Sequence, residues 1–139
     1  MKYAEGGCLC GAVRFRVTGA PSASLICHCR TCRKASAAPS VAWLRFDRGN
    51  LELLSGVPRR FASSSGVERT FCPDCGSPLT YANDESPSSI DVTTISLDDE
   101  STFPPTREVW VSHKVRWEPT DPNLVQYPRS TSEGPYPDG

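Results

Sequence analysis

Hydrophobic and polar residues alternate in the first clearly patterned stretch of the chain. In residues 12–17 the apolar side chains Val13, Phe15 and Val17 alternate with arginines. This period of two predicts a β-strand with one buried face. Similar short segments, separated by Gly, Pro, Asn, Asp or Ser, predict further strands at residues 25–28, 40–46, 51–54, 59–62, 67–71, 79–82, 89–97 and 108–111. We therefore expect a mainly β fold of antiparallel sheets.

Helical patterns are scarce. Residues 30–36 predict one short helical turn that needs packing or a metal to form, and a second turn is expected near residues 98–101. Beyond Trp117 the composition changes, because residues 118–139 contain Pro119, Pro122, Pro128, Pro135 and Pro137 with few large apolar residues. We expect one domain over residues 1–117 and a Pro-rich, irregular tail over residues 118–139, partly extended or disordered.

The charge balance and the lack of long apolar runs argue against several kinds of partner and location. The chain has 139 residues, a net charge of -1 and a pI near 6.1. This balance provides no broad positive surface, so neither nucleic acid nor an anionic membrane is an expected partner. Neither a signal-peptide core nor a membrane-spanning run is visible, and we expect a cytoplasmic protein. In a reducing compartment, clustered cysteines are more often metal ligands or catalysts than disulfides.

The seven cysteines fall into three groups along the chain. Cys72 and Cys75 form a Cys-Pro-x-Cys-Gly turn, a zinc knuckle that supplies half of a tetrahedral site. Cys8 and Cys10, in a turn flanked by glycines, are the natural other half. Four thiolates close a zinc site, so this one is expected to be structural. Another pairing, with Cys27 and Cys29 completing the knuckle, remains open.

The third group, Cys27, Cys29 and Cys32, lies within six residues at a strand end that runs into a helical turn. Three protein ligands leave one position for water or substrate, which is typical of a catalytic zinc. The alternative is a second structural site completed by His28, a buried carboxylate or another subunit. We expect His28 to point away from the metal.

The sequence resembles the glutathione-dependent formaldehyde-activating enzymes, whose domain is shared with the centromere protein V group, in five blocks: GGCLCGAVRF, CHCRTCRKASAAP, SSSGVERTFCPDCGSPLTY, IDVTTISLDD and EVWVSH. The resemblance covers residues 5–117. It implies an Mss4-like, zinc-stapled β fold with two Zn²⁺ per chain. It assigns Cys8, Cys10, Cys72 and Cys75 to the structural zinc. It assigns Cys27, Cys29 and Cys32 to the catalytic zinc.

A zinc ion with three thiolate ligands suits a thiol substrate, because soft sulfur matches the metal and the bound thiol is held as a thiolate. We therefore expect a carbon–sulfur lyase acting on a thiol and a small aldehyde, by resemblance glutathione and formaldehyde. The alternatives are a zinc-binding interaction module and a thiol or metal redox sensor. Candidates for contact with the glutathione carboxylates are Arg30, Arg33, Lys34, Arg59 and Arg69, and candidates for proton transfer are Glu68 and His113.

Overall fold

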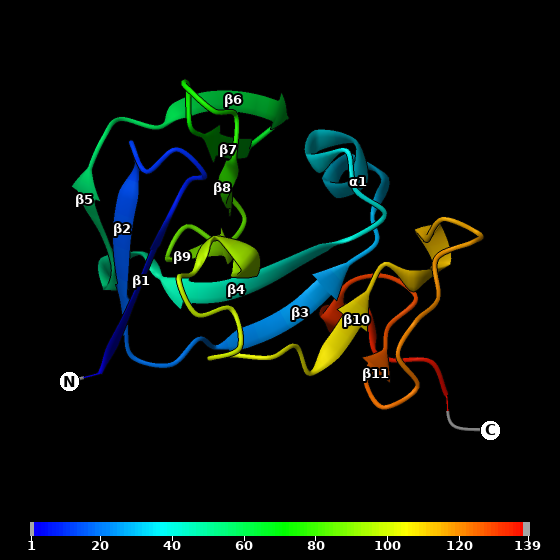
Figure 1. Cartoon of the computed structure of the whole chain (residues 1–139). Coiled ribbons are helices and arrows are strands. Elements are labelled where there is room, and N and C mark those ends of the chain that lie inside the picture. Colours follow the sequence, from blue (N-terminus) through cyan, green and yellow to red (C-terminus); the bar gives the residue numbers. More distant parts are fainter. Residues whose placement is uncertain (1, 138–139) are drawn as a thin grey trace. The chain divides into compact units, whose positions relative to one another are not determined.

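The computed structural model describes residues 2–137 and shows a mainly β protein, as the sequence predicts (Figure 1). The strands are β1 (Tyr3–Gly7), β2 (Arg14–Thr18), β3 (Ala23–Cys27), β4 (Val41–Asp47), β5 (Leu51–Ser55), β6 (Arg59–Ser64), β7 (Val67–Phe71), β8 (Pro78–Asn83), β9 (Ser89–Thr93), β10 (Arg107–Val109) and β11 (Val125–Gln126). The helices are α1 (Arg30–Ser36) and the short 3₁₀ turns η1 (Arg48–Asn50), η2 (Thr94–Ser96), η3 (Val111–His113) and η4 (Thr131–Glu133).

Two strands were not predicted, and one ends early. β1 and β11 lack an alternating pattern, and each is paired with a neighbouring strand, β1 with β2 and β11 with β10. The strand expected over residues 89–97 ends at Thr93, where the Ser96 hydroxyl donates a 2.7 Å hydrogen bond to the Thr93 carbonyl. The chain then continues as η2 rather than as extended backbone.

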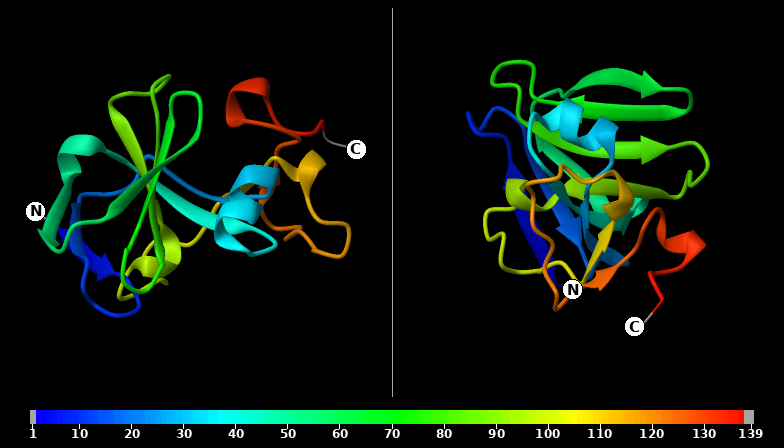
Figure 2. Two further views of the ribbon diagram at one scale, coloured as in Figure 1. Left: turned by 90° about the horizontal axis from the view of Figure 1, so that it is seen from above. Right: turned by 90° about the vertical axis from the view of Figure 1, so that its right-hand side faces the viewer.

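The chain forms two compact units, and the first contains residues 2–23 and 44–103. Within it, β1, β2 and β5 form a three-stranded antiparallel sheet, with Ala4 opposite Val17 and Phe15 opposite Leu53. A second set of strands follows the order β4, β9, β8, β7, β6. The right view of Figure 2 shows the antiparallel ladder of β6, β7 and β8 in green.

The core of the first unit is made by the inward faces of these strands. Its buried members are Cys8, Val13, Phe15, Val17, Leu44, Phe46, Cys72, Leu79, Val92 and Leu97. The alternation predicted for residues 12–17 is confirmed, since Val13, Phe15 and Val17 are all at most 3% exposed. Because two cysteines belong to this cluster, anything that they bind is coupled to the packing of the core.

The second unit contains residues 24–43 and 104–137. Here β10 pairs in parallel with both β3 and β11, placing Val109 opposite Cys27 and Glu108 opposite Gln126. The expectation of antiparallel sheets therefore holds for the first unit, whereas this unit contains parallel pairs between segments far apart in the chain. Helix α1 follows β3 after two residues and ends at Ser36, and its C-cap Ala37 has a φ of 50° (Figure 1).

Residues beyond Trp117 belong to the second unit and bond to its backbone. The Tyr127 N–H donates to the Glu108 carbonyl at 2.9 Å, and the Trp110 N–H donates to the Arg129 carbonyl at 3.1 Å. The boundary between a domain and a tail at residue 117 stays a prediction. Among the residues that the structure describes, no helix is long and apolar enough to span a membrane.

Candidate metal centres

Four cysteine side chains meet in the first unit. The sulfurs of Cys8, Cys10, Cys72 and Cys75 all lie within 4.8 Å of one another. The Cys8 and Cys10 sulfurs are 3.6 Å apart, and those of Cys10 and Cys72 are 3.8 Å apart. A tetrahedral ion with metal–sulfur bonds of about 2.3 Å places its sulfur ligands about 3.8 Å apart. The donor set and its spacing thus fit a thiolate-bound metal ion.

Two tight turns aim these sulfurs at one point. In the first, the Cys8 N–H donates to the Val13 carbonyl and the Gly11 N–H to the Cys8 carbonyl, both at 3.1 Å. In the second, the Gly76 N–H donates to the Cys72 carbonyl at 2.8 Å. Gly11 and Gly76 have φ values of 81° and 78°, a region that favours glycine. The glycines next to both cysteine pairs are therefore what lets each turn close.

Hydrogen bonds prepare part of this cluster for the thiolate form. The Val13 N–H, 3.2 Å from the Cys8 sulfur, lowers the pKa of Cys8. The Ser77 hydroxyl and N–H lower the pKa of Cys75 to about 5. At Cys10 the Ala12 N–H lowers the pKa, but hydrogen bonding with Cys8 and its neighbours raises it to about 12. Hydrogen bonding thus favours the thiolate form at Cys8 and Cys75 and the thiol form at Cys10.

The second cluster lies within one turn of chain in the second unit. Cys27 ends β3, Cys29 caps α1, and Cys32 lies in the first turn of α1, with the three sulfurs within 4.8 Å of one another. The Cys32 N–H donates to the Cys29 sulfur at 3.3 Å, as an N-cap side chain does. Cys27 and Cys32 are buried, whereas Cys29 is partly exposed. Cys29 is thus the member of the cluster that solvent reaches most easily.

The electrostatics of the second cluster favour negative charge at Cys29. Hydrogen bonds from Cys27 and Cys32 lower the pKa of Cys29, and the Thr31 hydroxyl, 3.3 Å from its sulfur, adds to this effect. The same contacts with Cys29 and Cys32, together with burial, raise the pKa of Cys27. Three crowded sulfurs at one helix start are the donor set that a soft metal ion binds. This cluster, like the first, could hold a metal ion.

The structure therefore brings together the cysteines in the predicted groups. It does not join His28 to the three sulfurs: its Nε2 lies 2.7 Å from Glu108 Oε1. Glu68 pairs with Arg60 at 3.9 Å in the first unit, and the His113 ring packs against Trp110. Of the two candidates for proton transfer, Glu68 therefore contacts an arginine and His113 contacts a tryptophan.

The basic candidates differ in what they contact. Arg33 donates to the carbonyls of His28 and His113, at 3.1 and 2.9 Å, so its guanidinium links the start of α1 to η3. Arg69 donates to the Ser63 hydroxyl and lies over the Tyr81 ring. Arg30 and Lys34 are exposed on α1, the helix that carries Cys32.

Glu108 and Ser77 are functional candidates that the sequence reasoning missed. Glu108 is the first residue of the strand expected over residues 108–111, and a charged residue at the start of an apolar segment is a signal of a buried partner. Ser77 follows the Cys-Pro-x-Cys-Gly turn, and nothing in the sequence pattern around it predicts a contact with the cysteines.

Comparison with known proteins shows which family this chain resembles. The sequence model of the family described as glutathione-dependent formaldehyde-activating enzyme matches residues 3–113. An uncharacterized lyase of Schizosaccharomyces pombe is 34% identical over 85 residues, which cover 60% of this chain and 61% of that protein. The chain thus spans about three fifths of that relative's length. A Halomonas elongata protein, named for the same kind of enzyme as the family, is 27% identical over 122 residues, covering 81% of this chain and 78% of its own.

A solved structure shares the fold. The crystal structure of a Rhodobacter sphaeroides protein superposes with a TM-score of 0.60 at 19% identity, covering 73% of this chain and 97% of that one. The family match takes in both cysteine clusters and most of the strands around them. The chain therefore belongs to the family of glutathione-dependent formaldehyde-activating enzymes.

Proposed function

We propose that this protein is a zinc-dependent carbon–sulfur lyase that joins a thiol to a small aldehyde or reverses that reaction, with glutathione and formaldehyde as the substrates. Membership of the family and the lyase named among its relatives support an enzyme of this class. The observation that carries the proposal is the cluster of Cys27, Cys29 and Cys32. Among residues 2–137, no fourth His, Cys, Asp or Glu atom joins these three sulfurs.

The two clusters take different roles in the proposal. Cys8, Cys10, Cys72 and Cys75 would hold one zinc ion, and four protein ligands leave no position for a substrate. Since Cys8 and Cys72 are part of the hydrophobic core, binding of this ion would stabilise the fold of the first unit. Cys27, Cys29 and Cys32 would hold the second zinc ion and leave one position for a thiol.

When bound there, zinc would lower the pKa of a thiol and keep it as a thiolate at neutral pH. The protein's own residues set the conditions around it. The Thr31 hydroxyl and the Cys32 N–H both contact the Cys29 sulfur, and these contacts compensate negative charge at the exposed edge of the cluster. Burial of Cys27 and Cys32 keeps water from the other sulfurs.

The reaction balances without an oxidant or a reductant. In the forward direction the thiol sulfur bonds to the formaldehyde carbon, the π electron pair of the carbonyl moves to oxygen, and the proton lost by the thiol ends on that oxygen. The product is S-hydroxymethylglutathione. Glutathione carries two carboxylates, and the exposed cations Arg30 and Lys34 are the residues of α1 that we propose attract them. Arg33 already donates from Nε and Nη2 to two backbone carbonyls, so fewer of its N–H groups remain for a substrate carboxylate.

The test combines metal analysis with an exchange assay. The purified protein should contain two equivalents of zinc and should accelerate the interconversion of glutathione, formaldehyde and their adduct above the spontaneous rate, as followed by NMR exchange. Cys29→Ser should lose one equivalent of zinc and the acceleration. Ser36→Ala, a change of similar size at the far end of α1, should keep both. Two equivalents of zinc with no acceleration would exclude the proposed reaction and favour a non-catalytic zinc module.

A further inference from the structure

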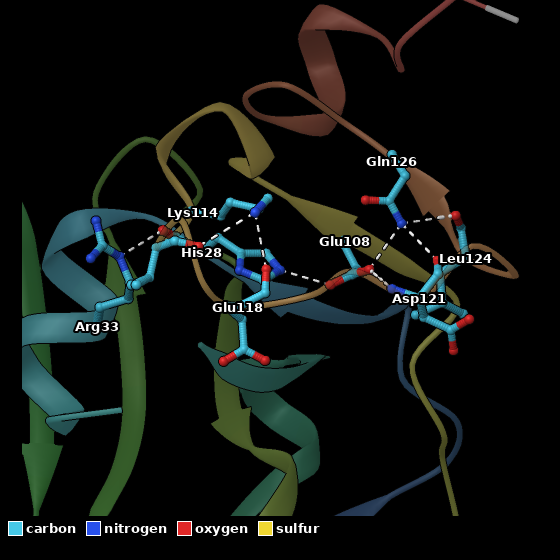
Figure 3. A network of polar contacts seen from close by, with 9 residues as sticks. His28, Arg33, Glu108, Lys114, Glu118, Asp121, Leu124 and Gln126 are labelled. Atoms are coloured by element: carbon cyan, nitrogen blue, oxygen red, sulfur yellow. Dashed lines mark hydrogen bonds and ion pairs between the residues drawn. The ribbon is translucent and has the colours of Figure 1, made fainter. Parts of the chain in front are cut away.

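His28, the residue between Cys27 and Cys29, is held at three points in the second unit (Figure 3). Its N–H donates to the Val109 carbonyl at 3.0 Å, and its carbonyl accepts from Arg33 Nε at 3.1 Å. Its ring Nε2 lies 2.7 Å from Glu108 Oε1. The side chain is 1% exposed, and within residues 2–137 its Nδ1 has no hydrogen-bond partner. The orientation of the ring therefore depends on Glu108.

The second carboxylate oxygen of Glu108 is also occupied. Oε2 accepts from the Asp121 N–H at 2.7 Å and from Gln126 Nε2 at 2.9 Å. Gln126 Nε2 in turn contacts the carbonyls of Asp121 and Leu124, at 2.9 and 3.1 Å. Figure 3 shows these groups converging on one carboxylate from the short segment 121–126. A buried carboxylate with hydrogen-bond partners on both oxygens is fixed in direction.

The segment that fixes Glu108 lies outside the part of the chain that the family model matches. That match ends at residue 113, whereas Asp121 and Gln126 come later. β11 carries Gln126 and pairs with β10, directly opposite Glu108. The hydrogen bonds form a continuous path from this C-terminal segment through Glu108 to His28.

We propose that Glu108 is a positioning residue of the three-cysteine cluster, and that residues 121–126 complete the cluster by holding it. The inference rests on the second metal site proposed above. Cys27 and Cys29 are separated by one residue, so the directions of their sulfurs depend on the backbone of His28. Holding the His28 ring through Glu108 fixes that backbone, as outer residues around metal ligands commonly do.

The test resolves the two metal equivalents by titrating the zinc-loaded protein with a chelator. Glu108→Gln keeps the shape of the side chain but replaces one acceptor oxygen with an N–H₂ group, which only donates, so the side chain can no longer accept hydrogen bonds on both of its terminal atoms. We expect it to release one equivalent at a chelator concentration lower by about 10–100-fold, the usual effect of losing such a partner. Gln126→Ala, which removes one donor at a partly exposed position, should move the same equivalent in the same direction by less.

Asp91→Asn is the matched control. Asp91 is a buried carboxylate in the first unit, 2.9 Å from Arg45 Nε, and the substitution makes the same chemical change there. It should leave both equivalents at wild-type affinity. Cobalt substitution shows which metal ion is bound more weakly. In Glu108→Gln, the sulfur-to-cobalt absorption that is lost at low chelator concentration should be the one that is missing in Cys29→Ser.

The outcomes separate this inference from the proposed function. Two equivalents in the wild type, with both unchanged in Glu108→Gln and Gln126→Ala, would overturn the positioning role and leave the proposed enzyme intact. Equal weakening by Asp91→Asn would also overturn it, because the effect would then be one of general stability. A wild-type protein that binds a single equivalent would overturn both proposals.

Discussion

The backbone N–H of Leu9 donates a 3.0 Å hydrogen bond to the Ser77 hydroxyl, across 68 positions of sequence. Leu9 lies between Cys8 and Cys10, and the Ser77 oxygen is also 3.2 Å from the Cys75 sulfur. One small side chain therefore contacts both halves of the four-cysteine cluster. These contacts hold the two turns beside each other, which lowers the cost of bringing four sulfurs together.

Ser77→Ala should destabilise the protein through this cluster. The substitution leaves the Leu9 N–H without its acceptor and removes the hydroxyl beside the Cys75 sulfur. We expect the free energy of unfolding to fall by about 1 kcal/mol, the usual net value of such a hydrogen bond, as measured by urea unfolding of metal-loaded protein. The control is Ser22→Ala, whose hydroxyl makes a longer 3.4 Å contact at the surface. Equal effects of the two substitutions would contradict a specific role for Ser77.

Local pattern was enough to predict the elements that form from their own residues. The expected segments 67–71 and 30–36 coincide with β7 and α1, because alternation and a cysteine-capped turn are properties of neighbouring residues. β1 was missed because its sequence, YAEGG, carries no apolar alternation. Gly6 is required there by a distant neighbour, the carbonyl of Ser96, which only the folded chain reveals.

The cysteine groups were predictable for a similar reason, since a metal site leaves its spacing in the sequence. The surroundings of the sulfurs were not. Glu108 reaches His28 across 80 positions, and Gln126 reaches Glu108 from a segment expected to be an irregular tail. Contacts of this kind depend on the parallel pairing of β10 with β3 and β11, which no local pattern indicates.

Gly6→Ala should be strongly destabilising. A Cβ at Gly6 would lie 2.3 Å from the Ser96 carbonyl oxygen and 2.9 Å from Leu97 Cα, so backbone would have to move. We expect a loss of about 1–3 kcal/mol or more, as for overpacking in general, measured by thermal or urea unfolding. Gly49→Ala is the control, because a Cβ there has no atom within 4 Å. Comparable stability of the two variants would show that β1 can shift to make room.

Asp91 should make the free energy of unfolding fall as the pH rises through its raised pKa. Burial raises the pKa of the Asp91 carboxyl, and the bond to Arg45 offsets this only in part. The folded protein therefore binds a proton there more tightly than the unfolded chain, whose carboxyl has a pKa of about 3.9. The stability that this group contributes falls as pH rises from about 3.9 through the raised pKa.

Asp91→Asn lacks this titration, so wild type should lose stability relative to the variant as pH rises over that window. Urea unfolding of both proteins at several pH values measures the difference, and any effect of pH on metal binding is common to the two. A difference that grows in favour of wild type instead would mean that Arg45 stabilises the ionised carboxylate by more than burial disfavours it.

Cobalt-substituted protein should report the entry of a thiol at one cluster only. Three cysteine ligands leave a position that a fourth sulfur can occupy, whereas four cysteine ligands do not. Added glutathione should therefore change the sulfur-to-cobalt absorption of one equivalent and leave the other unaltered. S-methylglutathione, which has no thiol, is the matched control ligand. An unchanged spectrum with glutathione would mean that the second cluster is closed by a ligand from elsewhere.

Cys72→Ser and Cys29→Ser should separate folding from function. Cys72 is 0% exposed and packs within the core of the first unit, so its replacement leaves a buried hydroxyl in that core and removes one sulfur from the proposed structural site. We expect Cys72→Ser to be insoluble or to lose its cooperative unfolding transition. Cys29 is partly exposed at the start of α1, outside that core, and serine remains a good N-cap there.

Cys29→Ser should therefore keep its circular dichroism spectrum and its structural metal while it loses the second equivalent and the thiol-dependent reaction. The comparison is informative because both changes replace one sulfur atom by oxygen. Metal content, circular dichroism and exchange rate, measured on the same samples, give three readings per variant. If Cys29→Ser unfolds as Cys72→Ser does, the second cluster also supports the fold, and its assignment as an open catalytic site is wrong.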